Sequence, residues 1–220
     1  KRMFVKENND TYSNFTLDFT EEFVLYLLYR TFGIVNVKRG IHMKKKDQLL
    51  INAARIVNEE GIQKLTMSYL AEASEITKGG ILYHFENKEE LLYKMNEKVI
   101  NEFEDSIRGY KANLTGPYQY TRAYALATMD YLTEIENILL PAVFISSYED
   151  KRSKAYWEDT IKRWDEAFEN DQGDQNKILE LRMICDGIWF SLTYNISSEY
   201  KEKMETVVRN YIQSLEKEVN

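Results

Sequence analysis

The sequence predicts an all-α protein. The 220 residues include only two prolines, Pro117 and Pro141, and nine glycines, and this scarcity favours long helices over strands and turns. Apolar residues recur at helical spacing over almost the whole chain beyond Lys44. The composition, 44% apolar and 30% charged, is ordinary for a water-soluble chain, and the length accommodates one large domain or two small ones.

Residues 1–42 are the least regular part of the sequence. They contain an aromatic and β-branched stretch, but charged residues interrupt it, and its clean apolar run covers only residues 23–29. A membrane-spanning helix needs about 20 mostly apolar residues. No small-residue cleavage site follows the run, so a secretory signal is not expected either. We therefore expect no contact with a membrane.

Two interpretations of residues 1–42 stay open. The codons for residues 38–40, Lys-Arg-Gly, can form a purine-rich ribosome-binding sequence a few nucleotides before Met43. In that case Met43 is the native start of the protein. Alternatively, residues 1–42 are a genuine N-terminal extension with an accessory helix.

The next segment predicts a helix over about residues 45–60. Leu50, Ala53, Ala54 and Val57 share one face, and Gly61 provides a stop. A second, short helix follows Thr66, a good N-cap residue, and places Leu70 and Ala71 at helical spacing.

A polar break at Ser74 and Glu75 separates this helix from a third one over about residues 78–83, capped by Thr77. We expect the turn at Glu75 to avoid positive φ. Asn87 then caps a long helix over about 88–108, with Glu90 as its capping-box partner. Two short helices, a tight turn and a third helix start within residues 65–92 are typical of a DNA-binding helix-turn-helix.

Residues 44–92 resemble the DNA-binding domain of the tetracycline-repressor (TetR) family. The resemblance rests on order, spacing and residue type at Ala53-Ala54, Gly61, Thr66, Leu70-Ala71, Thr77-Lys78-Gly79, Tyr83-His84-Phe85 and Lys88-Glu89-Glu90-Leu91-Leu92. It implies a three-helix DNA-binding domain at 43–91, joined by the fourth helix to a helical ligand-binding and dimerisation domain at 92–220. Glu75 replaces a frequent turn glycine, and Leu82 replaces a frequent tyrosine or arginine.

The resemblance also assigns DNA contacts to individual residues. The base-facing positions are Thr77, Lys78, Gly79, Gly80 and Leu82, and the glycines allow close approach of the backbone to the major groove. Phosphate or backbone contacts are assigned to Thr66, Ser68, Tyr83, His84 and Lys88, and a lysine arm is assigned to Lys44, Lys45 and Lys46. Phe85 and Tyr69 are expected in the core.

The net charge of −7 does not exclude a double-stranded DNA partner, because the acidity is unevenly distributed. Residues 92–220 carry 16 positive and 23 negative side chains, whereas residues 43–91 carry seven and eight. The helix-turn-helix segment is therefore close to neutral. We expect modest nonspecific DNA affinity with pronounced salt dependence.

The C-terminal part predicts helices over about residues 118–136, 138–149, 152–170, 175–196 and 199–218. Its aromatic residues exceed what a helical bundle needs for filling, and acidic residues such as Asp130 and Asp165 lie on the same helices. An aromatic box with an acidic wall suits a cationic or bulky amphipathic effector. The candidate lining residues are Tyr124, Tyr131, Phe144, Tyr148, Trp157, Trp164 and Trp189. The alternative is that the aromatic residues fill the core and the acids face water.

The helix over 175–196 is apolar on nearly all sides, so one face needs a partner outside its own domain. Together with the last helix it resembles the helix pair that forms the dimer interface of the family. The resemblance assigns this interface to Leu181, Ile184, Gly187, Ile188, Val208, Tyr211 and Ile212. A twofold homodimer presents two recognition helices to a palindromic operator.

The leading functional hypothesis is a ligand-responsive transcriptional repressor in the cytoplasm. A helical enzyme is disfavoured because the chain has only two histidines, one cysteine, and no motif for a metal, a phosphate loop or a nucleophile–base pair. We therefore expect no catalytic residues, metal or cofactor. The lone Cys185 suits a reducing compartment and a buried structural role. A third hypothesis is an interaction protein of the same fold that binds a protein partner.

Overall fold

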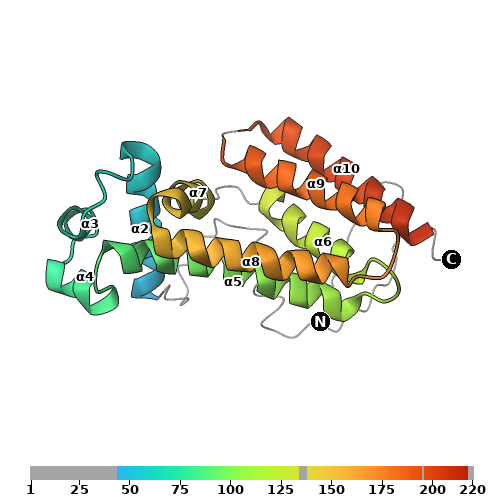
Figure 1. Ribbon diagram of the computed structural model, residues 1–220. Helices are drawn as coiled ribbons and strands as arrows, with labels where there is room; N and C mark the ends of the chain where they lie inside the picture. The colour runs from blue at the N-terminus through green and yellow to red at the C-terminus, as the bar shows by residue number, and fades with distance from the viewer. Residues whose placement is uncertain (1–43, 134–137, 195, 218–220) are drawn as a thin grey trace, which may run out of the picture. The chain divides into compact units, whose positions relative to one another are not determined.

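The computed structural model describes residues 44–133, 138–194 and 196–217, and these residues form nine α-helices without a strand (Figure 1). The prediction of an all-α protein is confirmed. The predictions for residues 1–42 and for a native start at Met43 lie outside the described residues. The helices are α2 (Lys45–Glu60), α3 (Met67–Ala73), α4 (Lys78–His84), α5 (Lys88–Asn113), α6 (Gln119–Thr133), α7 (Leu139–Glu149), α8 (Lys151–Glu169), α9 (Gln175–Leu192) and α10 (Ser198–Lys217).

Helices α2, α3 and α4 pack around a common apolar core. Ala53 and Ala54 of α2, Leu70 of α3 and Ile81 of α4 are all completely buried. Small side chains on α2 allow α3 to approach it closely, α4 packs on α3, and Leu65, just before α3, is also completely buried. Gly61 ends α2 with a φ of 90°, a conformation that favours glycine, and its amide donates to the Val57 carbonyl over 3.1 Å.

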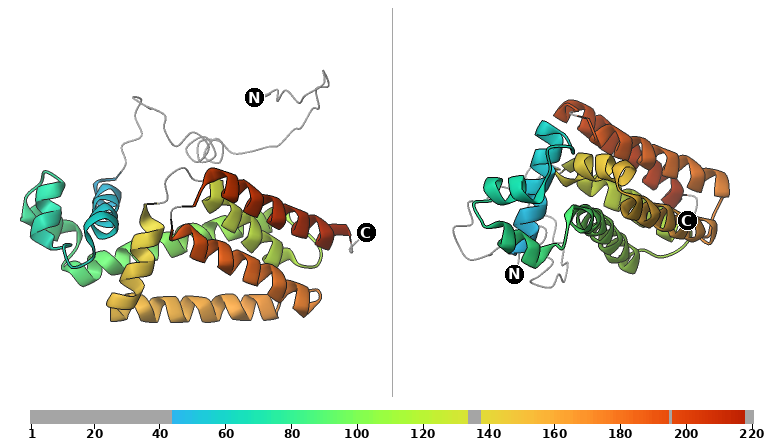
Figure 2. Two further views of the ribbon diagram at one scale, coloured as in Figure 1. Left: turned by 90° about the horizontal axis from the view of Figure 1, so that it is seen from above. Right: turned by 60° about the vertical axis from the view of Figure 1, so that its left-hand side comes forward.

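The long helix α5 follows this three-helix unit and packs on α6, α7 and α8 (Figure 2). The sequence predicted its end near residue 108, but it continues to Asn113. The additional turn contains Gly109, whose cost inside a helix is about 1 kcal/mol. Tyr110 offsets this cost, because it packs against the core and its hydroxyl donates to Asp130 of α6 over 2.7 Å.

Helix α7 connects the C-terminal helices to α2. It packs on α2, α5 and α8, and the side-chain amide of Asn58 in α2 donates to the carbonyl of Ile138, just before α7, over 2.8 Å. An ion pair of 3.3 Å between Asp47 of α2 and Lys98 of α5 adds a second link. The remaining helices form one bundle, in which α6 packs against α5, α8, α9 and α10. Over the described ranges, every helix is too short or too polar to cross a membrane.

Candidate nucleic-acid interface

Two threonines define where the helices of the candidate DNA-binding unit begin. The hydroxyl oxygen of Thr66 accepts from the amide of Tyr69, and that of Thr77 accepts from the amide of Gly80, both over 3.1 Å. Each bond satisfies an amide that the first helical turn leaves without a partner. The start of α3 and the start of α4 are therefore fixed by side chains that are themselves exposed.

The turn between α3 and α4 corrects one expectation from the sequence. Glu75 was predicted to avoid positive φ, but its φ is 53°. The amide of Glu75 donates to the Glu72 carbonyl and that of Ile76 to the Ala71 carbonyl, over 3.1 and 3.0 Å. This pair of bonds is the Schellman arrangement, which requires a left-handed residue after the helix end. The geometry expected of the family's glycine is thus kept, with glutamate in its place.

The orientation of α4 follows from one buried residue inside it and one directly after it. Ile81 and Phe85, four positions apart, are 0% and 1% exposed and belong to the core of the three-helix unit. The opposite side of the helix carries Tyr83, which is 85% exposed, and Leu82, which is 44% exposed. Lys78 is also exposed and begins the helix.

The glycines of α4 leave this outward side almost bare. A side-chain carbon at Gly79 would meet only the Thr77 hydroxyl, at 3.9 Å. No side chain therefore projects from the outward surface of α4 at Gly79, whereas the side chains of Lys78, Leu82 and Tyr83 project around it. This shape allows the backbone of the helix to come close to another surface.

The structure places the other predicted DNA contacts in different environments. Thr66, Ser68, Lys44 and Lys45 are exposed. Lys45 and Lys46 were predicted to belong to a lysine arm, but they lie in the first turn of α2. Lys46 is also exposed, and its ammonium lies 5.6 Å from the centre of the Phe85 ring, directly after α4.

His84 and Lys88 are half-buried. The ring of His84 meets that of Tyr83 edge-on, with 5.1 Å between the ring centres. The ammonium of Lys88 donates to the Ile62 carbonyl over 2.7 Å, so this lysine ties α5 to the loop after α2. Sequence reasoning had assigned to Lys88 only a phosphate contact.

Asn87 caps α5 as predicted, since its side-chain oxygen accepts from the Glu90 amide over 2.8 Å. The carboxylate of Glu90 accepts in return from the amide of Glu86 over 2.6 Å. Two acidic residues in the first turn, Glu89 and Glu90, complement the positive end of the helix dipole. The start of the long helix is thus firmly fixed directly after α4.

The predicted dimer contacts fall on two different sides of α9 and α10. Four of them are buried inside the single chain and belong to its own core: Leu181, Ile188, Val208 and Ile212. Ile184 and Tyr211 are half-buried, and Gly187 is exposed. The sequence did not identify the large apolar residues that stay exposed on α9 and directly after it, which are Leu179, Met183, Phe190 and Tyr194, 53–64% exposed.

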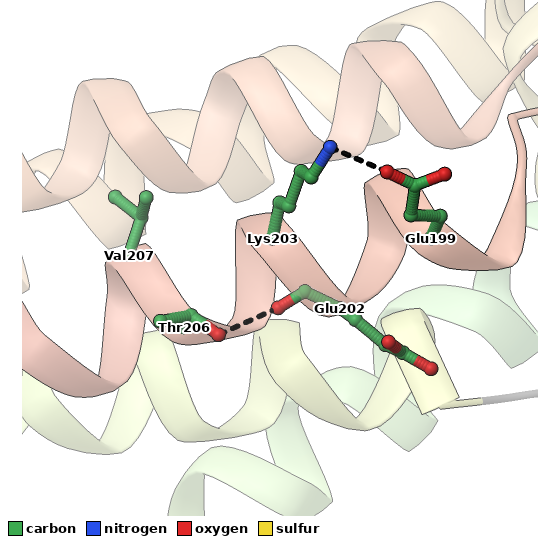
Figure 3. Close-up of a pocket in the computed structure, with 5 residues that line it drawn as sticks. All are labelled: Glu199, Glu202, Lys203, Thr206 and Val207. Atoms are coloured by element: carbon green, nitrogen blue, oxygen red, sulfur yellow. Dashed lines mark hydrogen bonds and ion pairs between the residues drawn. The ribbon is translucent and has the colours of Figure 1, made fainter.

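These exposed residues continue onto α10, where Tyr200 and Val207 are 53% and 52% exposed. We call the six residues Leu179, Met183, Phe190, Tyr194, Tyr200 and Val207 the α9–α10 face. A shallow groove between the two helices is lined by Met183, Gly187 and Val207, among others. A second, open hollow is lined by residues of α10 alone, Glu199, Glu202, Lys203, Thr206 and Val207 (Figure 3). In it Lys203 donates to Glu199 over 2.6 Å and Thr206 to the Glu202 carbonyl over 2.8 Å.

The candidate effector residues surround Phe103 of α5, which is fully buried. Rings of Tyr124, Tyr131, Trp164 and Trp189 meet Phe103 edge-on, with 4.7–5.9 Å between ring centres. These four rings come from α6, α8 and α9 and are packed against one another. Burial raises the pKa of the Tyr124 hydroxyl well above its usual range.

The other three candidates lie further out. Trp157 and Phe144 are half-buried, with 6.4 Å between their ring centres, and Tyr148 is 82% exposed on α7. The two acids expected near the box are paired within the chain. Asp130 accepts from the hydroxyls of Ser106 and Tyr110, both over 2.7 Å, and Asp165 is ion-paired with Arg182.

Comparison with known proteins supports both halves of the structure. Residues 49–95 match the model of the bacterial regulatory proteins of the tetR family, and residues 118–215 match the tetracyclin repressor-like C-terminal domain. The biofilm operon icaADBC HTH-type negative transcriptional regulator IcaR of Staphylococcus epidermidis is 32% identical over 78 residues. This segment is 34% of the chain and spans 42% of the length of that relative.

Two solved structures share the fold at low sequence identity. The ketosteroid transcriptional regulator KstR2 of Mycobacterium tuberculosis has a TM-score of 0.55 and 17% identity, and the match covers 82% of this chain and 94% of that one. AibR in complex with isovaleryl coenzyme A and operator DNA has a TM-score of 0.52 and 19% identity, covering 74% and 95%.

Proposed function

The chain belongs to the tetR family of bacterial regulatory proteins, and from this premise we propose that it is a transcriptional repressor. It binds a palindromic operator as a homodimer and is released by a small-molecule effector. The observation that carries the proposal is the outward side of α4. Its exposed Lys78, Leu82 and Tyr83 stand around two glycines, on a helix fixed by Thr77 and by the turn at Glu75.

This arrangement suits the major groove of DNA, which admits an α-helix whose N-terminal residues meet base edges. A lysine near the start of α4 supplies a donor for a guanine edge or a phosphate, and the bare surface at Gly79 lets the backbone approach. Tyr83 and Lys44 to Lys46 supply the phosphate contacts that position the helix. The curated relative with 32% identity over its matched segment is named a negative transcriptional regulator, which supports repression rather than activation.

The α9–α10 face supports the homodimer. Its six apolar residues are each more than half exposed, and three of them, Met183, Tyr200 and Val207, line one groove between α9 and α10. Clustered apolar residues on the surface mark sites of protein–protein contact. A twofold axis at this face brings the same residues of two chains together. The two copies of α4 then meet successive major grooves, about 34–36 Å apart, on one side of the DNA.

The aromatic cluster around Phe103 supports an effector site in the C-terminal bundle. It joins α5, the helix that leaves the DNA-binding unit, to α6, α8 and α9. A molecule that enters between these rings has to move the helices, and it shifts the protein toward the state in which it fits. One structure of similar fold was solved with both an acyl-coenzyme A and operator DNA. For this chain we propose an effector, without a chemical class.

The test of DNA binding is selection of bound sequences from a random double-stranded DNA library by the full chain. We expect a palindromic consensus. Lys78→Ala should weaken binding to it and lower the slope of log K against log salt by about 1, because one cationic contact is lost. Lys162→Ala removes the same charge from an exposed position of α8 and should leave affinity and slope unchanged. Failure to select any sequence would reject the proposal.

A further inference from the structure

Leu82 stands out among the outward residues of α4, because it is the one exposed aliphatic side chain on that helix. Leu82 is 44% exposed, whereas Ile81 of α4 and Phe85, directly after α4, are the residues that this segment buries in the core of the three-helix unit. Among the described residues, the side chains exposed on α4 are those of Lys78, Leu82 and Tyr83. Only two of these three can form a hydrogen bond with a base or phosphate.

We propose that Leu82 reads the C5-methyl group of a thymine in each half of the operator. In the major groove the methyl group of thymine is the only apolar group that a base edge presents. An exposed leucine can gain affinity there by removing apolar surface from water, whereas opposite a donor or acceptor it deprives a polar group of its water. The proposal rests on the proposed DNA-binding function.

The surroundings of Leu82 favour a tight apolar contact. Gly79 lies one turn earlier on the same side of α4, and beyond the Thr77 hydroxyl nothing occupies the space next to it. The helix can therefore approach the base edges until a side chain touches them. The Cα of Leu82 is held in place by its neighbour Ile81 and by Phe85, the residue that caps the end of α4, both of which are buried.

If Leu82 contacts a thymine methyl group, the affinity for the operator depends on that methyl group. Replacing thymine by uracil removes only the methyl group and leaves every hydrogen-bonding group of the base pair unchanged. A contact to one buried methyl group corresponds to about a fourfold change in affinity. A base read through hydrogen bonds does not respond to this replacement.

The experiment uses the sequence selected by the full chain. Each thymine of the consensus is replaced in turn by deoxyuridine, symmetrically in both half-sites, and the dissociation constant is measured by fluorescence anisotropy. We expect one position where the replacement weakens binding about fourfold per half-site. In the Leu82→Ala variant, replacing that thymine should leave the dissociation constant unchanged. At every other position the replacement should affect the variant as it affects the parent protein.

The matched control is Ile161→Ala, which truncates an aliphatic residue of α8 with 43% exposure and should keep the full response to uracil. Circular dichroism confirms that each variant is folded. The proposal is overturned if no position responds to uracil in the parent protein, or if the response persists in Leu82→Ala. Either result leaves the operator and its selection intact, whereas a failed selection counts against DNA binding itself.

Discussion

The side chain of Asn96 forms hydrogen bonds that link three helices, and its removal gives the sharpest test of how α7 and α8 are held against α5. Asn96 lies on α5 and is fully buried. Its amide nitrogen donates to the Leu92 carbonyl and to the Ser146 hydroxyl of α7, both over 2.8 Å. Its amide oxygen accepts from the indole of Trp157 on α8 over 2.7 Å.

The cost of Asn96→Ala can be worked out contact by contact. The Leu92 carbonyl keeps its helical bond, and the Ser146 hydroxyl still donates to the Val143 carbonyl over 3.1 Å. The indole N–H of Trp157 alone is left without a partner, which costs about 1–2 kcal/mol because this residue is only half-buried. The space left by the amide adds about 1 kcal/mol. We therefore expect a loss of about 2–3 kcal/mol in the free energy of unfolding.

Urea unfolding followed by circular dichroism measures this loss, at one fixed protein concentration because the stability of the proposed dimer depends on concentration. Asn113→Ala is the control. Asn113 lies on the same helix and donates to the carbonyl four residues earlier, as Asn96 does, but it is exposed. We expect its cost to stay within about 0.5 kcal/mol.

A double-mutant cycle separates the Asn96–Trp157 bond from the rest. Trp157→Phe removes the indole donor, so Asn96→Ala should cost about 1 kcal/mol less in that background. Additive effects of the two substitutions, or a loss below about 0.5 kcal/mol for Asn96→Ala, would contradict the assigned role. In that case apolar packing of α7, and not the hydrogen bonds of Asn96, would account for the stability of this contact.

Three further predictions concern other parts of the chain. Glu75→Gly should raise stability by about 1 kcal/mol, measured as an increase of a few degrees in Tm, because glycine adopts positive φ without strain; an unchanged or lower Tm would contradict this. Met183→Lys should reduce the mass found by light scattering to that of a single chain, whereas Ile161→Lys should not; a dimeric Met183 variant would exclude the α9–α10 face. Burial raises the pKa of the Cys185 thiol to about 12, so at pH 8 a thiol reagent should label it only after unfolding in urea, and rapid labelling of the folded chain would refute its burial.

The helix-turn-helix could be predicted from the sequence because its signals are local. Thr66, Thr77 and Asn87 each bond an amide three residues ahead, so the residue types alone mark the helix starts. Glu75 was misjudged because a non-glycine residue was taken to exclude positive φ. The left-handed turn lets Leu70 of α3 and Ile81 of α4 both reach the core, and this packing overrides the preference of one residue.

The α9–α10 face could not be predicted because α9 is apolar on nearly all of its sides. The periodicity of the sequence shows that such a helix is covered by other elements. It does not show which side of the helix packs against the helix's own chain. In this structure α6 packs on α9, and Leu181 and Ile188 of α9 are buried, whereas Met183 and Phe190 remain exposed. The role of Lys88 was missed for a similar reason, since its partner, the Ile62 carbonyl, lies 26 positions away in the sequence.

The proposed dimer and the proposed DNA contact depend on each other. One copy of α4 offers three exposed side chains from a unit of near-neutral charge, which is too little for tight binding at physiological salt. In a dimer, binding of the first α4 holds the second α4 close to its own half-site, so the second binding step is intramolecular. The affinity of the dimer for DNA then exceeds that of one copy many times, although each α4 makes the same contacts as before. The same coupling means that a small change in the separation of the two α4 helices removes most of the gain. An effector that moves α5 within the aromatic cluster therefore needs to alter that separation, and has no need to reach α4.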